Sequence, residues 1–206
     1  SPANNLPPGE RPRMARTTQF MLEYDIDSVG QAGIAEVQLW ATPDFGRTWK
    51  MWQTDADKQS PFDITVPQEG TYGFRIVIVG NNGLAGRAPA SGDLADLWVG
   101  VDTTKPVVRL TSAMYGEGPN AGNLDIRWEA SDSSFAERPI SLMFSEQPNG
   151  PWSTIASGWP NTGQHFWLVE ARIPDKIFLR IEAIDEAGNT GEHQLTEPIS
   201  TTGLVP

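Results

Sequence analysis

Short runs in which apolar and polar residues alternate recur along the whole chain. In Leu124-Asp125-Ile126-Arg127-Trp128-Glu129-Ala130, every second residue is apolar. A period of two is that of a β-strand with one buried face. Clusters of Gly, Pro, Asn and Asp separate these runs, and such clusters form turns. The pattern predicts an all-β chain of short strands joined by tight turns.

The same blocks of sequence occur twice, in the same order and about 104 residues apart. Phe20–Ile26 corresponds to Leu124–Ala130, Leu39–Thr42 to Leu142–Ser145, and Tyr72–Gly86 to Ile177–Gly191. Three matching blocks at nearly constant spacing indicate an internal duplication. We therefore expect two copies of one domain.

The joint between the copies is expected at Asp102-Thr103-Thr104-Lys105-Pro106, because Pro106 keeps the preceding residue extended. Residues 17–102 then form the first domain and residues 103–206 the second. Residues 1–16 are rich in Pro, Asn and Arg and show no alternation. They are either an N-terminal extension or an irregular first strand.

Each domain is predicted to hold about seven short strands, the number and spacing of an antiparallel β-sandwich of immunoglobulin-like type. In the first domain we expect Thr18–Asp27, Ala35–Thr42, Lys50–Thr54, Phe62–Val66, Thr71–Val79 and Asp93–Val101. In the second we expect Val107–Met114, Leu124–Ala130, Ile140–Ser145, Ser153–Ala156, Phe166–Ile173, Phe178–Ile184 and Glu192–Ile199.

Charge and composition reduce the classes of binding partner that the chain is expected to have. The 206 residues include 26 acidic and 15 basic side chains, a net charge of −11 that is divided almost evenly between the two domains. Nucleic acids and anionic membranes are bound through Lys and Arg, so neither is an expected partner. No apolar run approaches the ~18 residues of a membrane span, which argues against direct membrane insertion. The absence of Cys excludes disulfides and thiolate chemistry.

Several motifs resemble known domain families. Tyr72-x-Phe74-Arg75-Ile76, followed by Asn82-Gly83, resembles the sixth strand of fibronectin type III domains, and Trp128 stands where those domains bury a Trp of the second strand. The joint at Asp102–Pro106 is similar to joints of bacterial immunoglobulin-like surface repeats. The resemblance implies tandem fibronectin type III-like or immunoglobulin-like sandwiches in a secreted or cell-surface protein, extracellular or periplasmic.

The two copies depart from that family pattern in different places. Ile177 replaces the aromatic residue of Tyr72, and Tyr24 replaces Trp128. Each domain therefore keeps one of the two core aromatics. Without disulfides, the two sheets of each domain must be held together by aromatic packing, for which we expect Trp128, Trp152, Tyr24 and Trp49.

The segment Thr42-Pro43-Asp44-Phe45-Gly46-Arg47-Thr48-Trp49 fits the Asp box of sialidase-type β-propellers. In that motif the Asp binds backbone donors of a turn and the Trp packs beneath it. A propeller needs several such blades, whereas this chain has one copy. We interpret the motif as a hairpin that joins the third and fourth strands.

Carboxylates at Asp25, Asp27 and Glu36 have the first, third and twelfth positions of a calcium loop. Val29, at the fifth position, is not a ligand, and no helices are expected on either side. We interpret the segment as a strand that ends in an acidic loop, with Ca²⁺ as the alternative. Asp185-Glu186 near Asp102 is a second alternative, in which the ion sits at the joint.

Residues for nucleophilic catalysis are scarce. The two histidines, His165 and His193, stand in no Gly-x-Ser-x-Gly turn and no zinc-binding pattern. No glycine-rich loop could cradle a phosphate. We therefore expect no catalytic residues and no enzymatic activity.

Aromatic residues offer more scope for binding. Alternation places Trp40 and Arg75 on the outer face of a sheet, Trp52 is out of phase with Met51, and Trp159 follows a glycine in a turn. Exposed aromatic side chains bind sugar rings and protein partners. The candidate ligand- or partner-binding residues are Trp40, Arg75, Trp52 and Trp159.

The expected function is that of a non-catalytic extracellular module: a spacer, adhesion or protein-interaction unit next to other domains of the same polypeptide. The alternative is an accessory carbohydrate-binding module of a glycan-degrading enzyme, which would bind a glycan on its exposed tryptophans.

Overall fold

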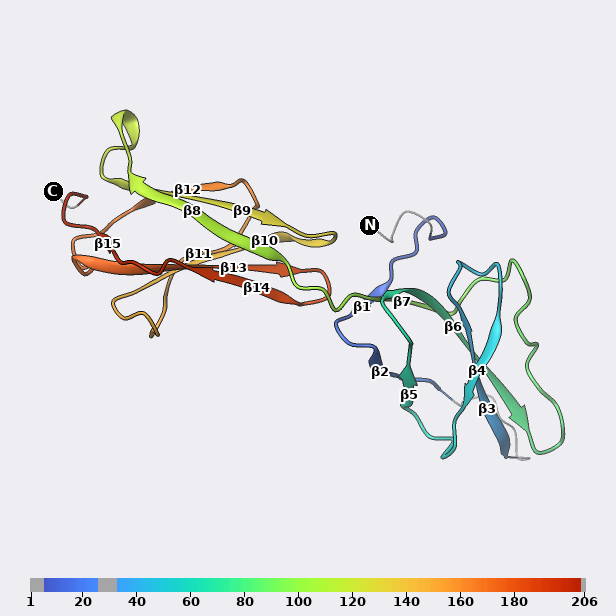
Figure 1. The fold of residues 1–206 in the computed structure, drawn as a ribbon. Helices are drawn as coiled ribbons and strands as arrows, with labels where there is room; N and C mark the ends of the chain where they lie inside the picture. Colours follow the sequence, from blue (N-terminus) through green and yellow to red (C-terminus); the bar gives the residue numbers. More distant parts are fainter. Residues whose placement is uncertain (1–5, 26–32, 205–206) are drawn as a thin grey trace. The chain divides into compact units, whose positions relative to one another are not determined.

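The computed structural model describes residues 6–25 and 33–204. It separates into two compact units, Ser1–Thr103 and Thr104–Pro206. Both are built from sheets of mainly antiparallel strands, and each has its own hydrophobic core (Figure 1). The described part has no helix long and apolar enough to cross a membrane.

The first unit packs a five-stranded sheet, in the order β1-β7-β6-β3-β4, against the two-stranded sheet β2-β5. Its strands are β1 (Arg13–Ala15), β2 (Gln19–Leu22), β3 (Ile34–Thr42), β4 (Lys50–Thr54), β5 (Phe62–Thr65), β6 (Gly70–Gly80) and β7 (Leu97–Val101). Alternate residues point into the core, where Val37, Leu39, Phe74 and Ile64 are almost fully buried.

The second unit packs the sheet β11-β10-β13-β14 against the three-stranded sheet β12-β9-β8. Its strands are β8 (Val107–Tyr115), β9 (Asn123–Ser131), β10 (Phe135–Ser145), β11 (Ser153–Trp159), β12 (Gln164–Leu168), β13 (Lys176–Asp185), β14 (Thr190–Gln194) and β15 (Ile199–Ser200), with one 3₁₀ helix, η2 (Gly118–Asn120). Leu124, Ile126, Ile140 and Ile181 form the centre of its core.

Residues that the sequence repeat equates occupy matching strand positions in the two units. Leu39 on β3 lies opposite Ile76 on β6, and Leu142 on β10 lies opposite Ile181 on β13. These are the residues that the sequence repeat equates. The all-β sandwich fold predicted from alternation is confirmed, because two facing sheets occur in each unit.

Several predicted strands have different bounds. The run from Asp93 forms a strand only from Leu97, because residues 93–96 belong to a connection that crosses the sheet. The predicted Glu192–Ile199 strand is divided between β14 and β15, and the predicted Phe166–Ile173 strand ends at Leu168. Strand β10 begins earlier than expected, at Phe135.

The first strands of the two units pair differently. Strand β8 runs antiparallel to β9 along most of its length, so the smaller sheet of the second unit has three strands. Strand β1, at the end of the segment for which an extension or an irregular strand was predicted, runs parallel to β7 instead. The smaller sheet of the first unit therefore has two strands.

Candidate functional site

The row Trp40, Arg75 and Met51 lies on the outer face of the larger sheet of the first unit. Trp40 is opposite Arg75 on β6 and Met51 on β4, and its indole N–H donates to Gln38 Oε1 at 3.1 Å. Trp40 is half-buried and Met51 is exposed. The structure thus places Trp40 and Arg75 side by side, as alternation predicts.

Arg75 is engaged by acids from a neighbouring connection. Its Nε lies 3.2 Å from Asp96 Oδ1 and its Nη1 lies 3.7 Å from Asp93 Oδ2. The cation–π contact found within the described residues lies in the other unit, where the guanidinium of Arg180 sits 5.6 Å from the centre of the Trp152 ring. The row around Trp40 is therefore a surface of one indole ring and one thioether, beside an arginine whose charge is balanced by two aspartates.

Trp52 lies on the opposite side of the sheet from Trp40. Its ring packs edge-on against Tyr72, with centroids 6.3 Å apart, at the border of the core. Its indole N–H donates to the carbonyl of Thr65 at 3.0 Å. The side chain thereby links β4 to the edge of β5, and it shares no surface with Trp40.

Trp159 ends strand β11 in the second unit. It packs against the core and meets His165 edge-on, with ring centroids 4.6 Å apart. Burial lowers the pKa of His165, because the charged imidazolium would lose its hydration there. The ring pair favours the neutral imidazole and links β11 to β12 at the edge of the sandwich.

The aromatic residues that were expected to hold the two sheets together have different surroundings. Trp128 is buried in the core and its indole N–H donates to Asn161 Oδ1 at 3.0 Å. Tyr24 packs near Phe62, and its hydroxyl donates to Asp55 Oδ2 at 2.6 Å. Burial, followed by the nearby Asp55 carboxylate, raises the pKa of Tyr24. Trp152 lies instead on the outer face, beneath Arg180.

The hairpin motif folds as a hydrogen-bonded staple between β3 and β4. Asp44 Oδ1 accepts from the Thr48 N–H and from the Thr42 hydroxyl, both at 2.8 Å, while Oδ2 accepts from the Thr48 hydroxyl at 2.7 Å. Desolvation of the carboxylate opposes ionisation, but the bonds from Thr48 and Thr42 outweigh it and lower the pKa of Asp44. These contacts support the hairpin interpretation.

Sequence reasoning missed a small second core beneath this hairpin. Trp98 is 2% exposed on the outer face of the sheet, and Phe45 stacks on it at 5.9 Å. Gly73 lies directly under the indole, because a Cβ there would stand 2.7 Å from the Trp98 ring. Gly46 has a φ of 84° and touches residue 93 of the β6–β7 connection. Gly73 and Trp98 meet only because β6 pairs with β7, a non-local contact that no local pattern signals.

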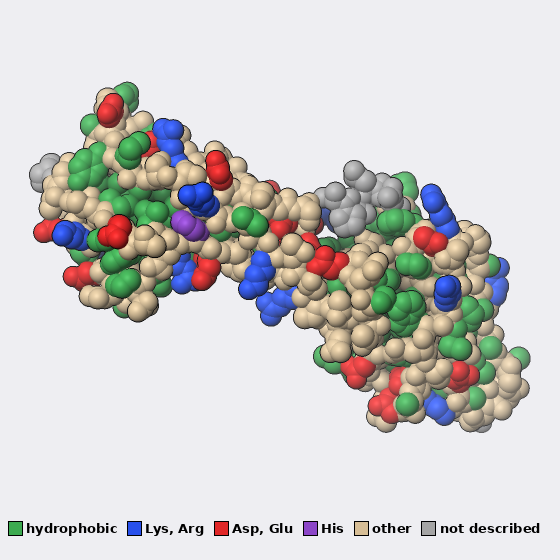
Figure 2. Space-filling view, in the orientation of Figure 1, with side chains coloured by type: hydrophobic (Ala, Val, Ile, Leu, Met, Phe, Trp, Pro, Cys, Tyr) green, Lys and Arg blue, Asp and Glu red, His purple; other side chains and the backbone are tan. Residues whose placement is uncertain are grey.

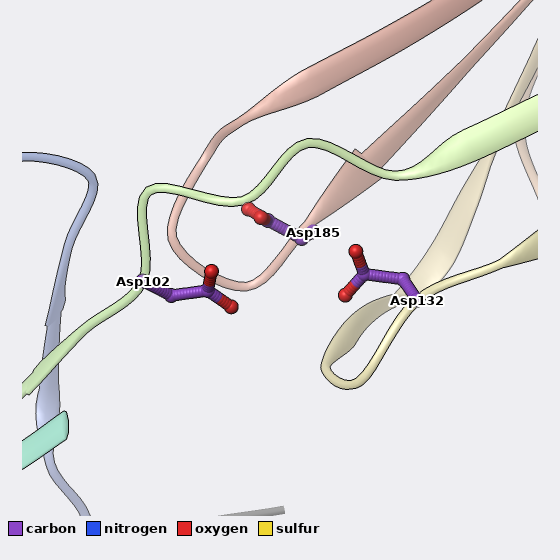
Figure 3. Close-up of side chains that lie close together, drawn as sticks. All are labelled: Asp102, Asp132 and Asp185. Atoms are coloured by element: carbon purple, nitrogen blue, oxygen red, sulfur yellow. The ribbon is translucent and has the colours of Figure 1, made fainter. Parts of the chain in front are cut away.

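Two aspartates of the second unit lie close together at the end of β13. Figure 3 shows Asp132 and Asp185, with Asp102 of the first unit also drawn, and ligand oxygens of the pair lie within 4.8 Å of each other. Asp185 is 2% exposed and accepts from the Asn189 backbone N–H and side-chain amide, both at 2.7 Å. Asp132 accepts from the Ser134 N–H at 2.7 Å. Both carboxylates thus cap turns.

The calcium alternatives stay predictions. Asp25 is exposed, and Glu36 Oε1 accepts from the Thr54 hydroxyl at 3.1 Å. Asp27 lies outside the described residues. Asp102 and Asp185 belong to different units.

Exposed apolar side chains also mark the smaller sheet of the second unit. Phe166 and Leu168 on β12 are 39% and 67% exposed, while the alternate residues His165 and Trp167 turn towards the core. Beside them, Asp125 accepts from Arg127 at 2.9 Å and from Gln164 at 2.7 Å. Partial burial opposes ionisation of Asp125, but these bonds prevail and lower its pKa. The face drawn in Figure 2 shows acidic and basic side chains interspersed over both units.

Comparison with solved structures identifies the fold. The chain is similar to the fibronectin(III)-like modules of Clostridium thermocellum CbhA, with a TM-score of 0.52 at 17% identity, over 92% of this chain and 88% of that one. A DUF3823 family protein from Bacteroides ovatus aligns at 10% identity with a TM-score of 0.30, over 89% of this chain and 97% of that one. Neither a protein-family model nor a curated protein matches the sequence. The fold is fibronectin type III-like.

Proposed function

We propose that the chain is a non-catalytic module of a larger secreted or cell-surface protein, in which its two units serve as spacer and protein-interaction domains. The observation that carries this proposal is the structural use of the groups that could do chemistry. His193 Nδ1 accepts from the Leu110 N–H at 3.2 Å, which ties β14 to β8, and His165 is packed against Trp159. Neither imidazole is placed to act as a general base.

The acidic side chains support the same proposal. Asp44 and Asp185 each accept several hydrogen bonds within their own turn. Carboxylates committed in this way stabilise hairpins rather than activate a substrate. The likeness to fibronectin(III)-like modules also favours an architectural role, although sandwiches of this type carry many functions.

Small-angle X-ray scattering tests the spacer role on the full chain. We expect an elongated two-lobed particle whose maximum dimension changes little between low and high salt. A compact single globule, or a distance distribution that broadens as in a freely jointed pair, would contradict a spacer that holds its neighbours at a set distance.

The carbohydrate-binding alternative is favoured by one observation, the partly exposed Trp40 next to Met51. A sugar ring stacked on Trp40 would change its fluorescence. The test is a titration with soluble polysaccharides, with Trp40→Ala as the matched control. We expect no saturable change in either protein, whereas a change lost only in Trp40→Ala would favour the alternative.

A further inference from the structure

One edge of the first unit, the free side of β2, presents backbone groups that pair with no described strand. The strand pairs only with β5 among the described strands, as Gln19↔Thr65, Phe20↔Ile64, Met21↔Asp63 and Leu22↔Phe62. Its counterpart in the second unit, β9, pairs on both sides, with β12 and with β8. Figure 1 shows β2 and β5 as the small layer of the first unit.

The direction of the backbone groups on β2 follows from one hydrogen bond. The Val66 N–H donates to the carbonyl of Thr18 at 2.9 Å, so Thr18, Phe20 and Leu22 direct their groups towards β5. The groups of Gln19 and Met21 then point to the other side. There the Gln19 carbonyl accepts from the Thr17 hydroxyl, while the backbone of Met21 has no partner among the described residues.

The second unit shows what fills this position. The Trp128 N–H donates to Gly163 at 3.0 Å, so Asp125 and Arg127, by the same alternation, point towards β8. Asp125 lies opposite Met114 on β8, and the sequence repeat equates Asp125 with Met21. An antiparallel strand with buried Val108 and Leu110 thus covers the edge that is open on β2.

The opposite edge of the same sheet is closed by side chains. Trp52 Nε1 donates to the Thr65 carbonyl at 3.0 Å and Gln53 Nε2 donates to the Asp63 carbonyl. Strand β5 therefore offers few free groups. The two-stranded sheet is open on the β2 side, where an extended chain could add a third strand.

The surroundings indicate the chemistry of such a strand. An open hollow of about 500 Å³ lies over the sheet and is lined by Phe20, Met21 and Ile64 together with Gln19, Asp63 and Thr65. Asp25, three residues after the end of β2, is the counterpart of Glu129, which lies opposite Arg109 of β8. A complementary strand would therefore place a basic residue opposite Asp25.

We propose that the free edge of β2 binds an extended segment of a partner polypeptide as an added antiparallel strand, with apolar side chains at alternate positions and a basic residue opposite Asp25. This inference rests on the proposed function as an interaction module and names its binding edge. The spacer role does not depend on it, because scattering measures that role in the absence of a partner.

The test is an amide chemical-shift titration of the full ¹⁵N-labelled chain with a synthetic peptide of residues 107–115, the strand that covers the equivalent edge. We expect saturable shifts at the Gln19 and Met21 amides. Met21→Pro removes the outward N–H and should weaken binding at least tenfold. Pro is compatible with an edge strand and removes only its donor. The matched variant Met21→Ala keeps the N–H and should bind within about twofold of the parent.

Two N-methylated peptides provide a second test that does not depend on whether the Met21→Pro variant folds. One carries methyl groups on the odd positions and the other on the even positions. Strand addition predicts that only one set abolishes binding, because only alternate amides face β2. No saturable shift, equal loss with both sets, or shifts confined to the second unit would overturn the proposal. Concentration-dependent broadening of Met21 without peptide would assign the edge to a second copy of this chain and would also overturn it.

Discussion

Arg75 and Arg180 occupy equivalent positions on β6 and β13, yet different neighbours hold them. Arg75 pairs with Asp93 and Asp96 from the connection between β6 and β7. Arg180 pairs with Glu182 and Glu192 of its own sheet and lies over Trp152. The outward-facing arginine therefore binds a loop that covers the sheet in the first unit, whereas in the second unit it contacts side chains on the outer face of its own sheet.

The connections explain this difference. Residues 81–96 separate β6 from β7, whereas residues 186–189 separate β13 from β14. The longer connection returns over the outer face, where it packs against the hairpin at Gly46 and beside Trp98. One unit thus gains a second small core outside the sandwich, and the other gains a third strand in its smaller sheet. Two sandwiches with matching central strands can therefore be completed at different places.

The largest expected effect is on the second core. Trp98→Ala should lower the free energy of unfolding of the first unit by about 3–5 kcal/mol, because it empties a buried indole site that cannot easily collapse. The matched change Trp152→Ala, on the half-buried outer face, should cost the second unit about 1 kcal/mol or less. Urea unfolding followed by NMR signals of each unit measures both, and equal losses would refute the second core.

The turn after β13 gives the next effect. Asp185→Ala should destabilise the second unit by about 2–3 kcal/mol, because two hydrogen bonds from Asn189 to a buried carboxylate are lost. Asp132→Ala removes the hydrogen bond from the Ser134 N–H and should cost about 1 kcal/mol. The first unit has Gly80 at the position equivalent to Asp185, so it has no carboxylate there to make these hydrogen bonds. Thermal melting in a chelating buffer compares the variants, and a larger loss for Asp132→Ala would contradict the turn-capping role.

A smaller effect concerns acid. Because its hydrogen bonds lower the folded-state pKa of Asp44, the carboxylate stabilises the hairpin above its unfolded pKa, and this stability is lost as pH falls below about 4. Asp44→Asn should therefore reduce, by a few degrees, the drop in melting temperature of the first unit between pH 6 and pH 3. The second unit contains Asp125 with a pKa lowered in the same sense and serves as the internal control. An unchanged drop in the first unit would refute the role of Asp44.

Alternation and the repeat were sufficient to predict the sandwich scheme. The strand Lys50–Thr54 has its predicted bounds, and Leu39 and Leu142 hold the equivalent places that the repeat predicts. These features depend on local pattern, which fixes which side chains face the core. Pairing partners are not local. The short β1 segment contains nothing that distinguishes an extension from a strand, and its pairing with β7 depends on residues some eighty positions away.

The candidate binding residues show the same limit. Alternation placed Trp40 and Arg75 correctly on one face, but Asp93 and Asp96 reach Arg75 through a connection whose alternation resembles a strand. Trp52 was expected on an exposed side, and the structure holds it at the border of the core by a hydrogen bond to Thr65, a contact between sheets that no local pattern shows. Whether any of these residues binds a ligand stays a prediction.

Amide hydrogen exchange at one equivalent pair tests the central comparison most directly. Met21 and Asp125 occupy the same place in the two units, and their N–H groups point to the side that β8 covers in the second unit alone. We expect the Asp125 amide to be protected from exchange and the Met21 amide to exchange nearly as fast as a solvent-exposed amide, while Phe20 stays protected. Protection of Met21 equal to that of Asp125 in the isolated chain would contradict an open edge on β2.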